Sequence, residues 1–366
     1  MTEPTILIKE VKNTVLITLN RPLSLNAVNY EMSENLLNIL KNIERQKEKQ
    51  LVILKGMGKS FCAGADIVEA RIKTADGKES EEFFKWCLDL NELFFVINTY
   101  QIPLITLVNG IAFGTGGGIM TLSKYSVVTE KAIFSMPETK FGFHPNCGAS
   151  YFFNKSKGKL GYYLGLTGER LKSTDIVKGG FATYFCNSNK LQKLEDKLIN
   201  CVTVQDITNV LDQFSEKKLP PFSLDPLAAK INECFSESTI EGIFYTLKQD
   251  RSAWATTTLQ TLEKYSPSSL KVSLKQLQYG KNMDLLESLA MESNITNNLY
   301  KFTDVLEGTK ALLIDRTRAP QWNPSRLSDV DEELINAHFN SVSDQFLRER
   351  LTKRRDNIKS ILKYKL

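Results

Sequence analysis

Histidine is scarce in this chain: its 366 residues contain only two, His144 and His338. So few histidines argue against a histidine-based metal site and against a separate histidine for each role in a catalytic triad. We therefore expect no metal site. The six cysteines are widely scattered and form no C-x-x-C pair, which predicts a reducing compartment and mostly buried thiols.

Long apolar runs are also missing. No stretch approaches the roughly 20 apolar residues that a membrane-spanning helix needs, so we expect no membrane span. The opening MTEPTILIKE has neither the apolar core of a secretory signal nor the Arg/Ser-rich, acid-poor composition of a transit peptide. The ending YKL departs from the peroxisomal S-K-L address at its first position, which makes that address weak. The import route stays open.

Excess positive charge is absent from most of the chain and concentrates at its end. Residues 345–366 carry eight Lys/Arg against two Asp/Glu, and the other 344 residues carry 39 basic and 40 acidic side chains. Apolar residues recur at helical spacing in this tail: Leu347, Leu351, Ile358, Ile361 and Leu362. Two interpretations stay open, a helix that docks on a partner and offers charge to phosphates, or a helix packed on its own core.

The first half of the chain alternates between strand and helix patterns. An amphipathic helix is predicted over 30–48 and an apolar-rich helix around 83–98. Short apolar runs predict strands at 6–8, 15–19, 51–56, 103–110, 126–129 and 133–136, with a turn at Lys12-Asn13 between the first two. This alternation predicts an α/β arrangement with right-handed crossovers.

The second half reads as helical from about Leu160. The stretch SEKKLPPFSLD at 215–225 interrupts this pattern and is typical of a linker. Further on, Pro267 fits the first turn of a helix after Ser266. We expect three regions: a core over 1–220, a helical region over 221–344, and the basic tail over 345–366.

Two stretches of small residues suggest where backbone groups meet a ligand. In KSFCAGADI (59–67), Ala65 follows a glycine and is placed to present its N–H at a turn. In NGIAFGTGGGIM (109–120), a buried strand leads into a glycine cluster that opens a helix near Gly116. Helix-start N–H groups favour developing negative charge, as in an oxyanion hole. The alternatives are tight packing for the first stretch and phosphate binding for the second, which lacks the Lys-Ser/Thr ending of a P-loop.

A third stretch, MPETKFGFHPNCG at 136–148, carries polar side chains suited to catalysis. It contains the carboxylate Glu138 and, eight residues later, the amide Asn146. The alternative is an extended strand end with a solvated Glu138. Between Phe143 and Pro145, His144 fits a packing or hydrogen-bonding role better than that of a base.

Together these motifs resemble the enoyl-CoA hydratase/isomerase (crotonase) superfamily, and within it the 3-hydroxyisobutyryl-CoA hydrolase branch. The resemblance spans residue 15 to about 340 and rests on ITLNRPLSLNAV (17–28), SFCAGADI (60–67), NGIAFGTGGG (109–118), MPET (136–139), GKLGYYLGLTGERL (158–171), SPSSLKVSLKQL (266–277) and EGTKALLIDRTRAPQWNPSRLSDV (307–330). It implies an α/β fold, a spiral of ββα turns with a helical C-terminal region.

The resemblance also implies roles for the residues of the glycine-rich stretches. The N–H groups of Ala65 and Thr115 would hold the thioester oxygen, with Gly116 beside them as part of the same substrate-binding turn. Thr115 stands where the motif usually has its second glycine. Gly118 stands where hydratases carry a second glutamate, which argues against hydration of a double bond and for the hydrolase branch.

The acidic residues match the hydrolases only in part. Glu138 matches the catalytic glutamate, but Asn146 replaces the aspartate expected eight residues later, and an amide neither accepts nor delivers a proton. The hydrolases have a further glutamate that contacts the substrate. When the two sequences are matched without gaps, its position in this chain is Leu90, which lies between Asp89 and Glu92.

Two functions of different classes follow. The first is an acyl-CoA thioester hydrolase of valine catabolism with catalytic Glu138 and Asn146, no metal and no cofactor, since CoA is part of the substrate. The second is a catalytically impaired structural protein of a ribonucleoprotein, such as the mitochondrial small ribosomal subunit, with residues 345–366 contacting RNA or ribosomal partners. A homo-oligomer is a further expectation. The resemblance implies a mitochondrial location, with the peroxisome and cytosol as alternatives.

Overall fold

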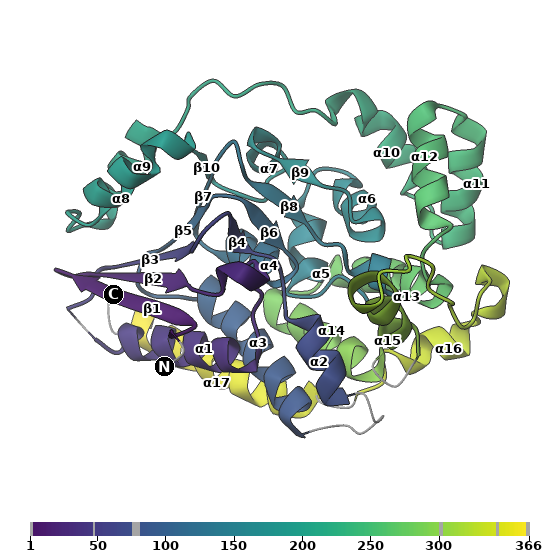
Figure 1. Cartoon of the computed structure of the whole chain (residues 1–366), viewed down its shortest axis with the longest axis horizontal. Coiled ribbons are helices and arrows are strands. Elements are labelled where there is room, and N and C mark those ends of the chain that lie inside the picture. Colours follow the sequence, from purple (N-terminus) through teal and green to yellow (C-terminus); the bar gives the residue numbers. More distant parts are fainter. Residues whose placement is uncertain (1–2, 47, 75–80, 300–302, 342–343, 364–366) are drawn as a thin grey trace. The chain divides into compact units, whose positions relative to one another are not determined.

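The computed structural model describes residues 3–46, 48–74, 81–299, 303–341 and 344–363 (Figure 1). By its internal contacts the chain divides into two compact units, each assembled from separate stretches of sequence. The first unit comprises Met1–Asp66, Val96–Met136 and Arg170–Pro226, and the second comprises Ile67–Phe95, Pro137–Glu169 and Leu227–Leu366. The region boundaries expected near residues 220 and 344 are drawn along the sequence and stay predictions.

The first unit contains a six-stranded sheet. In sheet order its strands are β1 (Ile6–Val11), β2 (Thr14–Leu19), β3 (Leu51–Gly56), β5 (Leu104–Val108), β7 (Tyr125–Val128) and β10 (Tyr184–Phe185). The pair β1–β2 is antiparallel and closes through the predicted turn, where Lys12 adopts a φ of +55°. The remaining pairs are parallel.

A smaller sheet of four strands lies in the same unit. Its order is β4 (Ser60–Cys62), β6 (Ile111–Phe113), β8 (Ile133–Ser135) and β9 (Leu171–Lys172). The chain moves from β3 to β4, from β5 to β6 and from β7 to β8, so each pass adds one strand to each sheet. At least one helix follows each of these passes along the chain. This is the predicted spiral of ββα turns, seen in Figure 1.

Apolar periodicity explains the elements that cover the large sheet. Helix α1 (Tyr30–Glu44) is capped by Asn29, whose side chain accepts from the Met32 N–H at 3.0 Å. Its predicted apolar face is buried, although the helix ends at residue 44 and not 48. Strand residues such as Leu16 and Ile53 pack with α8 (Leu191–Leu198) and α9 (Val204–Phe214) in one apolar cluster.

The second unit is predominantly helical among the residues described. Helix α13 begins at Pro267, and the Ser266 side chain accepts from the Ser269 N–H at 3.0 Å, as the sequence predicted. An apolar cluster around Val272 and Ile295 forms its core. The helices are α2 (Ile67–Thr74), α3 (Glu81–Asn98, whose last residues belong to the first unit), α5 (Ala149–Phe152), α6 (Leu160–Thr167), α10 (Ala228–Cys234), α11 (Ile240–Asp250), α12 (Ala253–Leu262), α13 (Pro267–Gly280), α14 (Leu285–Leu299), α15 (Thr303–Thr309), α16 (Glu332–Ala337) and α17 (Asp344–Lys363).

The basic tail forms helix α17 of the second unit. It contacts α14 (Figure 1), and its residues Leu347 and Leu351 are fully buried. Of the two interpretations of the tail, a helix packed on its own core is therefore confirmed for this part of α17. The last predicted tail residues, 364–366, lie outside the described residues.

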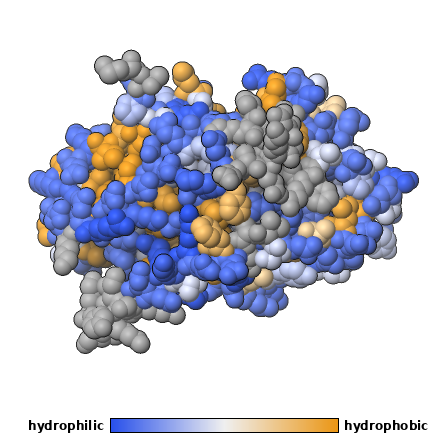
Figure 2. All heavy atoms as spheres, turned by 90° about the horizontal axis from the view of Figure 1, so that it is seen from below, coloured by the Kyte–Doolittle hydropathy of each residue, from blue (hydrophilic) through white to orange (hydrophobic). Residues whose placement is uncertain are grey.

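The molecular surface mixes polar and apolar side chains. On the face shown in Figure 2, hydrophobic residues form patches set among hydrophilic ones. Of the helices described, none is both long enough and apolar enough to cross a bilayer.

Candidate active site

The first predicted donor, Ala65, lies in the turn after β4. It forms a parallel bridge with Val28. The Val28 N–H donates to the Gly64 carbonyl at 2.8 Å, and the Asp66 N–H donates to the Val28 carbonyl at 2.9 Å. Both hydrogen bonds involve the neighbours of Ala65, so its own N–H points away from the bridge. Half-buried Ala65 is thus placed to donate to a ligand.

The second predicted donor, Thr115, is the first residue of α4 (Thr115–Leu122). The helix starts one residue before the predicted Gly116. Its N-cap is Gly114, which has a φ of +47° and no side chain to cap the helix. N–H groups in the first turn have no acceptor within their own helix and lie at the positive end of its dipole. The backbone N–H groups of Thr115 and Gly116 therefore lie in the first turn of α4, at the positive end of its dipole.

These two turns of the first unit touch each other. A Cβ added to Gly116 would lie 2.2 Å from the Cys62 carbonyl oxygen, and one added to Gly64 would lie 3.5 Å from the Phe113 carbonyl oxygen. Only glycine fits the first of these positions, since real Cβ atoms do not approach within 3.0 Å of another atom. The structure thus brings the predicted Ala65, Thr115 and Gly116 into adjoining turns.

Glu138 begins the 3-10 helix η2 (Glu138–Phe141) of the second unit and is buried. Its carbonyl accepts from the Phe143 N–H at 3.1 Å, while its side-chain Oε2 has no hydrogen-bond partner among the described residues. Burial raises the pKa of Glu138 to about 8, and the negative charge of Glu292 adds to the rise. The alternative of a solvated Glu138 at an extended strand end is therefore wrong.

Packing fixes the short helix that carries Glu138. The Thr139 hydroxyl donates to the Leu166 carbonyl at 3.0 Å. The helix ends at Gly142, whose φ of +72° suits glycine. A Cβ there would also lie 2.8 Å from the Asp304 carbonyl oxygen. A left-handed backbone and a close neighbour together explain the glycine in this motif.

Asn146 lies in the irregular segment between η2 and α5 and is half-buried. Its side-chain Oδ1 accepts from the Cys147 thiol at 2.5 Å, and its carbonyl accepts from the Ala149 N–H at 3.1 Å. Cys147 adopts a φ of +65°, so the chain turns sharply just after Asn146. The amide group is therefore held in a defined turn of the same unit as Glu138.

His144 is fully buried and hydrogen-bonded on both ring nitrogens. Its Nδ1 lies 2.7 Å from Gln276 Oε1, and its Nε2 lies 2.9 Å from the Thr296 hydroxyl. Gln276 Nε2 donates to the Pro145 carbonyl, so Gln276 Oε1 accepts and His144 Nδ1 carries the proton. Burial lowers the pKa of His144 to about 3. The prediction that His144 has a packing or hydrogen-bonding role is confirmed.

Glu292 of α14 is a buried carboxylate next to the segment that carries His144, and no sequence pattern was used to predict it. Glu292 is fully buried, and its two oxygens accept from the Gly148 and Ser150 N–H groups, each at 2.7 Å. Burial raises the pKa of Glu292 to about 7. One signal was present in the sequence: Glu292 lies three residues from both Leu289 and Ile295, so a charge interrupts the apolar face of a helix.

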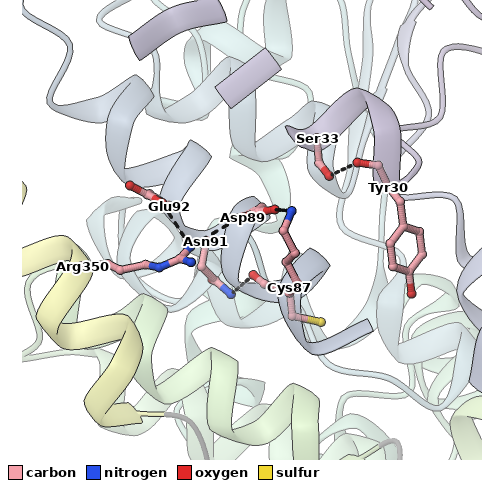
Figure 3. A network of polar contacts seen from close by, with 8 residues as sticks. Tyr30, Ser33, Cys87, Asp89, Asn91, Glu92 and Arg350 are labelled. Carbon is pink, nitrogen blue, oxygen red and sulfur yellow. Dashed lines mark hydrogen bonds and ion pairs between the residues drawn. The ribbon is translucent and has the colours of Figure 1, made fainter. Parts of the chain in front are cut away.

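The acidic residues beside Leu90 on α3 are already paired. Figure 3 shows Arg350 of α17 between Asp89 and Glu92, with distances of 3.3 and 3.4 Å to their carboxylates. Lys85 forms a further ion pair with Asp89 at 2.9 Å. Leu90 itself is buried. These carboxylates are therefore neutralised within the second unit.

Comparisons of the sequence with known proteins identify its relatives. A family model described as enoyl-CoA hydratase/isomerase matches residues 14–339. A human protein named mitochondrial 3-hydroxyisobutyryl-CoA hydrolase is 39% identical over 94% of this chain and 90% of its own length. An Arabidopsis thaliana protein named 3-hydroxyisobutyryl-CoA hydrolase-like protein 5 is 34% identical over 97% of this chain and 94% of its own length.

Solved structures match the fold over nearly the whole chain. A carnitinyl-CoA dehydratase from Mycobacterium thermoresistibile superposes with a TM-score of 0.87 at 26% identity, covering 93% of this chain and 97% of the other. An enoyl-CoA hydratase from Rhodobacter sphaeroides gives a TM-score of 0.85 at 26% identity, covering 93% and 99%. The predicted fold class is thereby confirmed.

Proposed function

This chain belongs to the enoyl-CoA hydratase/isomerase family, in its 3-hydroxyisobutyryl-CoA hydrolase branch, and we propose that it hydrolyses the thioester of 3-hydroxyisobutyryl-CoA. The observation that supports this most directly is Glu138, a buried carboxyl group with one oxygen that no described residue binds. A buried carboxyl group with such an oxygen, in a chain related to 3-hydroxyisobutyryl-CoA hydrolases, is suited to act on a substrate carbonyl or on water.

The two glycine-rich turns supply the electrostatic part of the reaction. As water adds to the thioester, its carbonyl oxygen becomes negatively charged. The N–H groups of Ala65 and Thr115 stabilise this oxyanion, and the helix dipole of α4 adds to the effect. Collapse of the intermediate breaks the C–S bond and gives the free acid and CoA, whose sulfur takes a proton. Thr115 serves as well as glycine because the donor is its backbone.

Glu138 acts through its ionised form, on the carbonyl or on the attacking water. Hydration of a double bond requires two carboxylates, and Gly118 stands at the position of the second. One carboxylate is sufficient for hydrolysis. Asn146 binds the substrate hydroxyl or orients the water through its amide, but it transfers no proton.

The reaction requires no metal ion and no redox cofactor. Hydrolysis changes no oxidation state, and the positive partial charges come from backbone N–H groups. CoA enters as part of the substrate. We place the protein in the mitochondrion because relatives such as the human protein are named mitochondrial.

The alternative function, a structural protein of a ribonucleoprotein, is not supported by the comparisons or by the packing of the tail. The comparisons relate the chain to hydrolases along nearly its full length. The apolar side of the tail is also occupied by its own unit at Leu347 and Leu351. Self-association remains a separate expectation of the family resemblance, to be measured by sedimentation of the purified protein.

Release of free CoA tests the proposal. The purified protein is mixed with 3-hydroxyisobutyryl-CoA, and thiol is measured with a chromogenic disulfide. We expect turnover, and a loss of about 10²–10⁴-fold in kcat for Glu138→Gln. Glu241→Gln, which makes the same change at an exposed position of the same unit, is the control. Absence of turnover in the native protein would contradict the proposal, as would full activity of Glu138→Gln.

A second variant addresses the amide. Asn146→Asp restores the aspartate of the hydrolases, and we expect it to raise kcat because a proton can then be transferred at this position. If only Asn146→Asp is active and the native protein is silent, the chain has lost the activity of its branch.

A further inference from the structure

Glu292 stands out among the buried groups that the proposed mechanism does not use. It comes from α14, yet both of its oxygens bind N–H groups at the start of α5, more than 140 residues earlier in the chain. The N-cap of α5 is Gly148, which has a φ of +85° and offers no side-chain cap. Glu292 therefore takes the place of the missing capping side chain.

A neighbouring helix holds the other end of the same turn. Gln276 of α13 accepts from His144 Nδ1 at 2.7 Å and donates to the Pro145 carbonyl. Its Nε2 also donates to the Ser150 hydroxyl at 2.9 Å. Asn146 thus stands in a turn that is fixed before it by Gln276 and after it by Glu292.

The same short segment joins this clamp to Glu138, whose carbonyl accepts from the Phe143 N–H at 3.1 Å, next to His144. Among the described residues, Glu292 is the ionisable group whose charge opposes the ionisation of Glu138. Within the described part of the chain, η2 packs most extensively against α6, α13 and α15. The other charged groups of these helices have partners of their own. On α13, Lys271 pairs with Glu241 and Lys275 with Glu332. On α15, Asp304 accepts from the Ser266 hydroxyl and the Asn323 N–H, and Glu307 accepts from the Gln321 N–H.

We propose that Glu292 is a positioning residue for thioester hydrolysis: it fixes the turn that carries Asn146 and sets the electrostatic surroundings of Glu138. The inference rests on the proposed function, because it assigns Asn146 and Glu138 to one reaction. Glu292 itself touches neither substrate nor water in this role. Its two backbone hydrogen bonds act through geometry, and its negative charge acts through space.

Amide hydrogen exchange tests the clamp without any activity. In Glu292→Gln, one oxygen becomes an NH₂ group that faces a backbone N–H, so one hydrogen bond is lost. We expect exchange at Gly148 and Ser150 to become roughly 10- to 100-fold faster, as the loss of a hydrogen bond to a charged group implies. Asp304→Asn, which alters another carboxyl group with two hydrogen bonds in the same unit, is the control and should leave this exchange unchanged. Equal exchange in the native protein and Glu292→Gln would overturn the clamp.

The pH profile of hydrolysis tests the electrostatic role. In the native protein kcat/KM should rise with pH as Glu138 ionises. Removing the neighbouring negative charge in Glu292→Gln should move this rise to lower pH, with kcat reduced about 10- to 100-fold by the loosened turn. A rise that stays at the native pH would overturn the electrostatic role. A merely structural residue would lower activity without moving the rise.

Glu292→Asp separates the two roles and serves if Glu292→Gln fails to fold. Aspartate keeps the charge but is shorter by one methylene, so it does not reach both N–H groups. We expect faster exchange at Gly148 or Ser150 with the pH profile unmoved, and native exchange in this variant would overturn the clamp. If the native protein hydrolyses no thioester, the proposed function fails, while the exchange experiment still decides the clamp.

Discussion

Glu138 is buried, and burial disfavours the ionised carboxylate that the proposed reaction uses. Its pKa is about 8 in the folded protein, against about 4.5 in an exposed carboxyl group. Between these values the folded state binds one more proton than the unfolded state. The free energy of unfolding therefore falls as pH rises through this range, because stability decreases wherever the native state holds the extra proton.

Glu138→Gln should remove this pH dependence. We expect the variant and the native protein to unfold at similar temperatures near pH 4.5. Their difference, in favour of the variant, should widen up to about pH 8 and then stay constant. Thermal unfolding followed by circular dichroism at a series of pH values measures this. Glu241→Gln is the matched control, and a difference that does not change with pH would contradict the buried carboxyl group.

The backbone of Thr115 offers a second test at this scale. Thr115→Pro removes the N–H group, and proline is well tolerated at the first position of a helix. We expect kcat to fall about 10²–10³-fold, as for the loss of one oxyanion-hole donor. Thr115→Gly keeps the donor and should stay active. Equal activity of the two variants would show that this N–H has no part in the reaction.

Some candidate site residues could be predicted from the sequence and others could not, for a physical reason. Ala65, Thr115 and Glu138 lie in short motifs whose small residues and turns are visible locally. Glu292 and Gln276 act through hydrogen bonds to residues more than 120 positions away. Such pairings depend on how helices pack, and neither periodicity nor spacing reveals them.

At the scale of the elements, contact between two turns explains a glycine. Gly116→Ala would place a Cβ 2.2 Å from the Cys62 carbonyl oxygen, so backbone must move. We expect a loss of about 1–3 kcal/mol in the free energy of unfolding, measured by urea denaturation. Gly165→Ala is the control, since its Cβ would meet side-chain carbons of Leu277 and Phe153 at 3.2 Å, which adjust more easily. Equal losses in both variants would contradict this account.

The apolar patterns in the sequence predicted many of the helices and strands that exist, but they did not always predict the residues at which these elements end. Strand β3 has its predicted bounds of 51–56, because a continuous apolar run is buried on both faces. Helix α1 ends four residues before the predicted 48, since beyond Ile43 the segment carries charged residues and no further buried apolar contact. Burial therefore decides where a helix pattern stops.

At the scale of the whole molecule, the C-terminal helix completes the second unit. Arg350 lies 261 positions beyond Asp89 in sequence, yet the two form an ion pair. Arg350→Gln leaves Asp89 and Glu92, both about 90% buried, without this cation. Because Arg350 is one-third exposed, we expect a loss of about 1–3 kcal/mol in the free energy of unfolding, below the value for a fully buried pair. Arg355→Gln, at a longer and more exposed ion pair with Asp284, should cost less than 1 kcal/mol.

Deletion of residues 345–366 separates the two roles considered for the tail. Burying a leucine stabilises a protein by about 1.5–3 kcal/mol, and the deletion removes both Leu347 and Leu351 from the interior. We expect a marked fall in unfolding temperature, measured by differential scanning fluorimetry, and no change in co-sedimentation with ribosomal particles. An unchanged unfolding temperature with lost co-sedimentation would reverse this conclusion, because the apolar side of α17 would then serve a partner. In that case the positive charge of the tail would also bind the partner, through contacts with phosphate groups. Such contacts add affinity that decreases as the salt concentration rises.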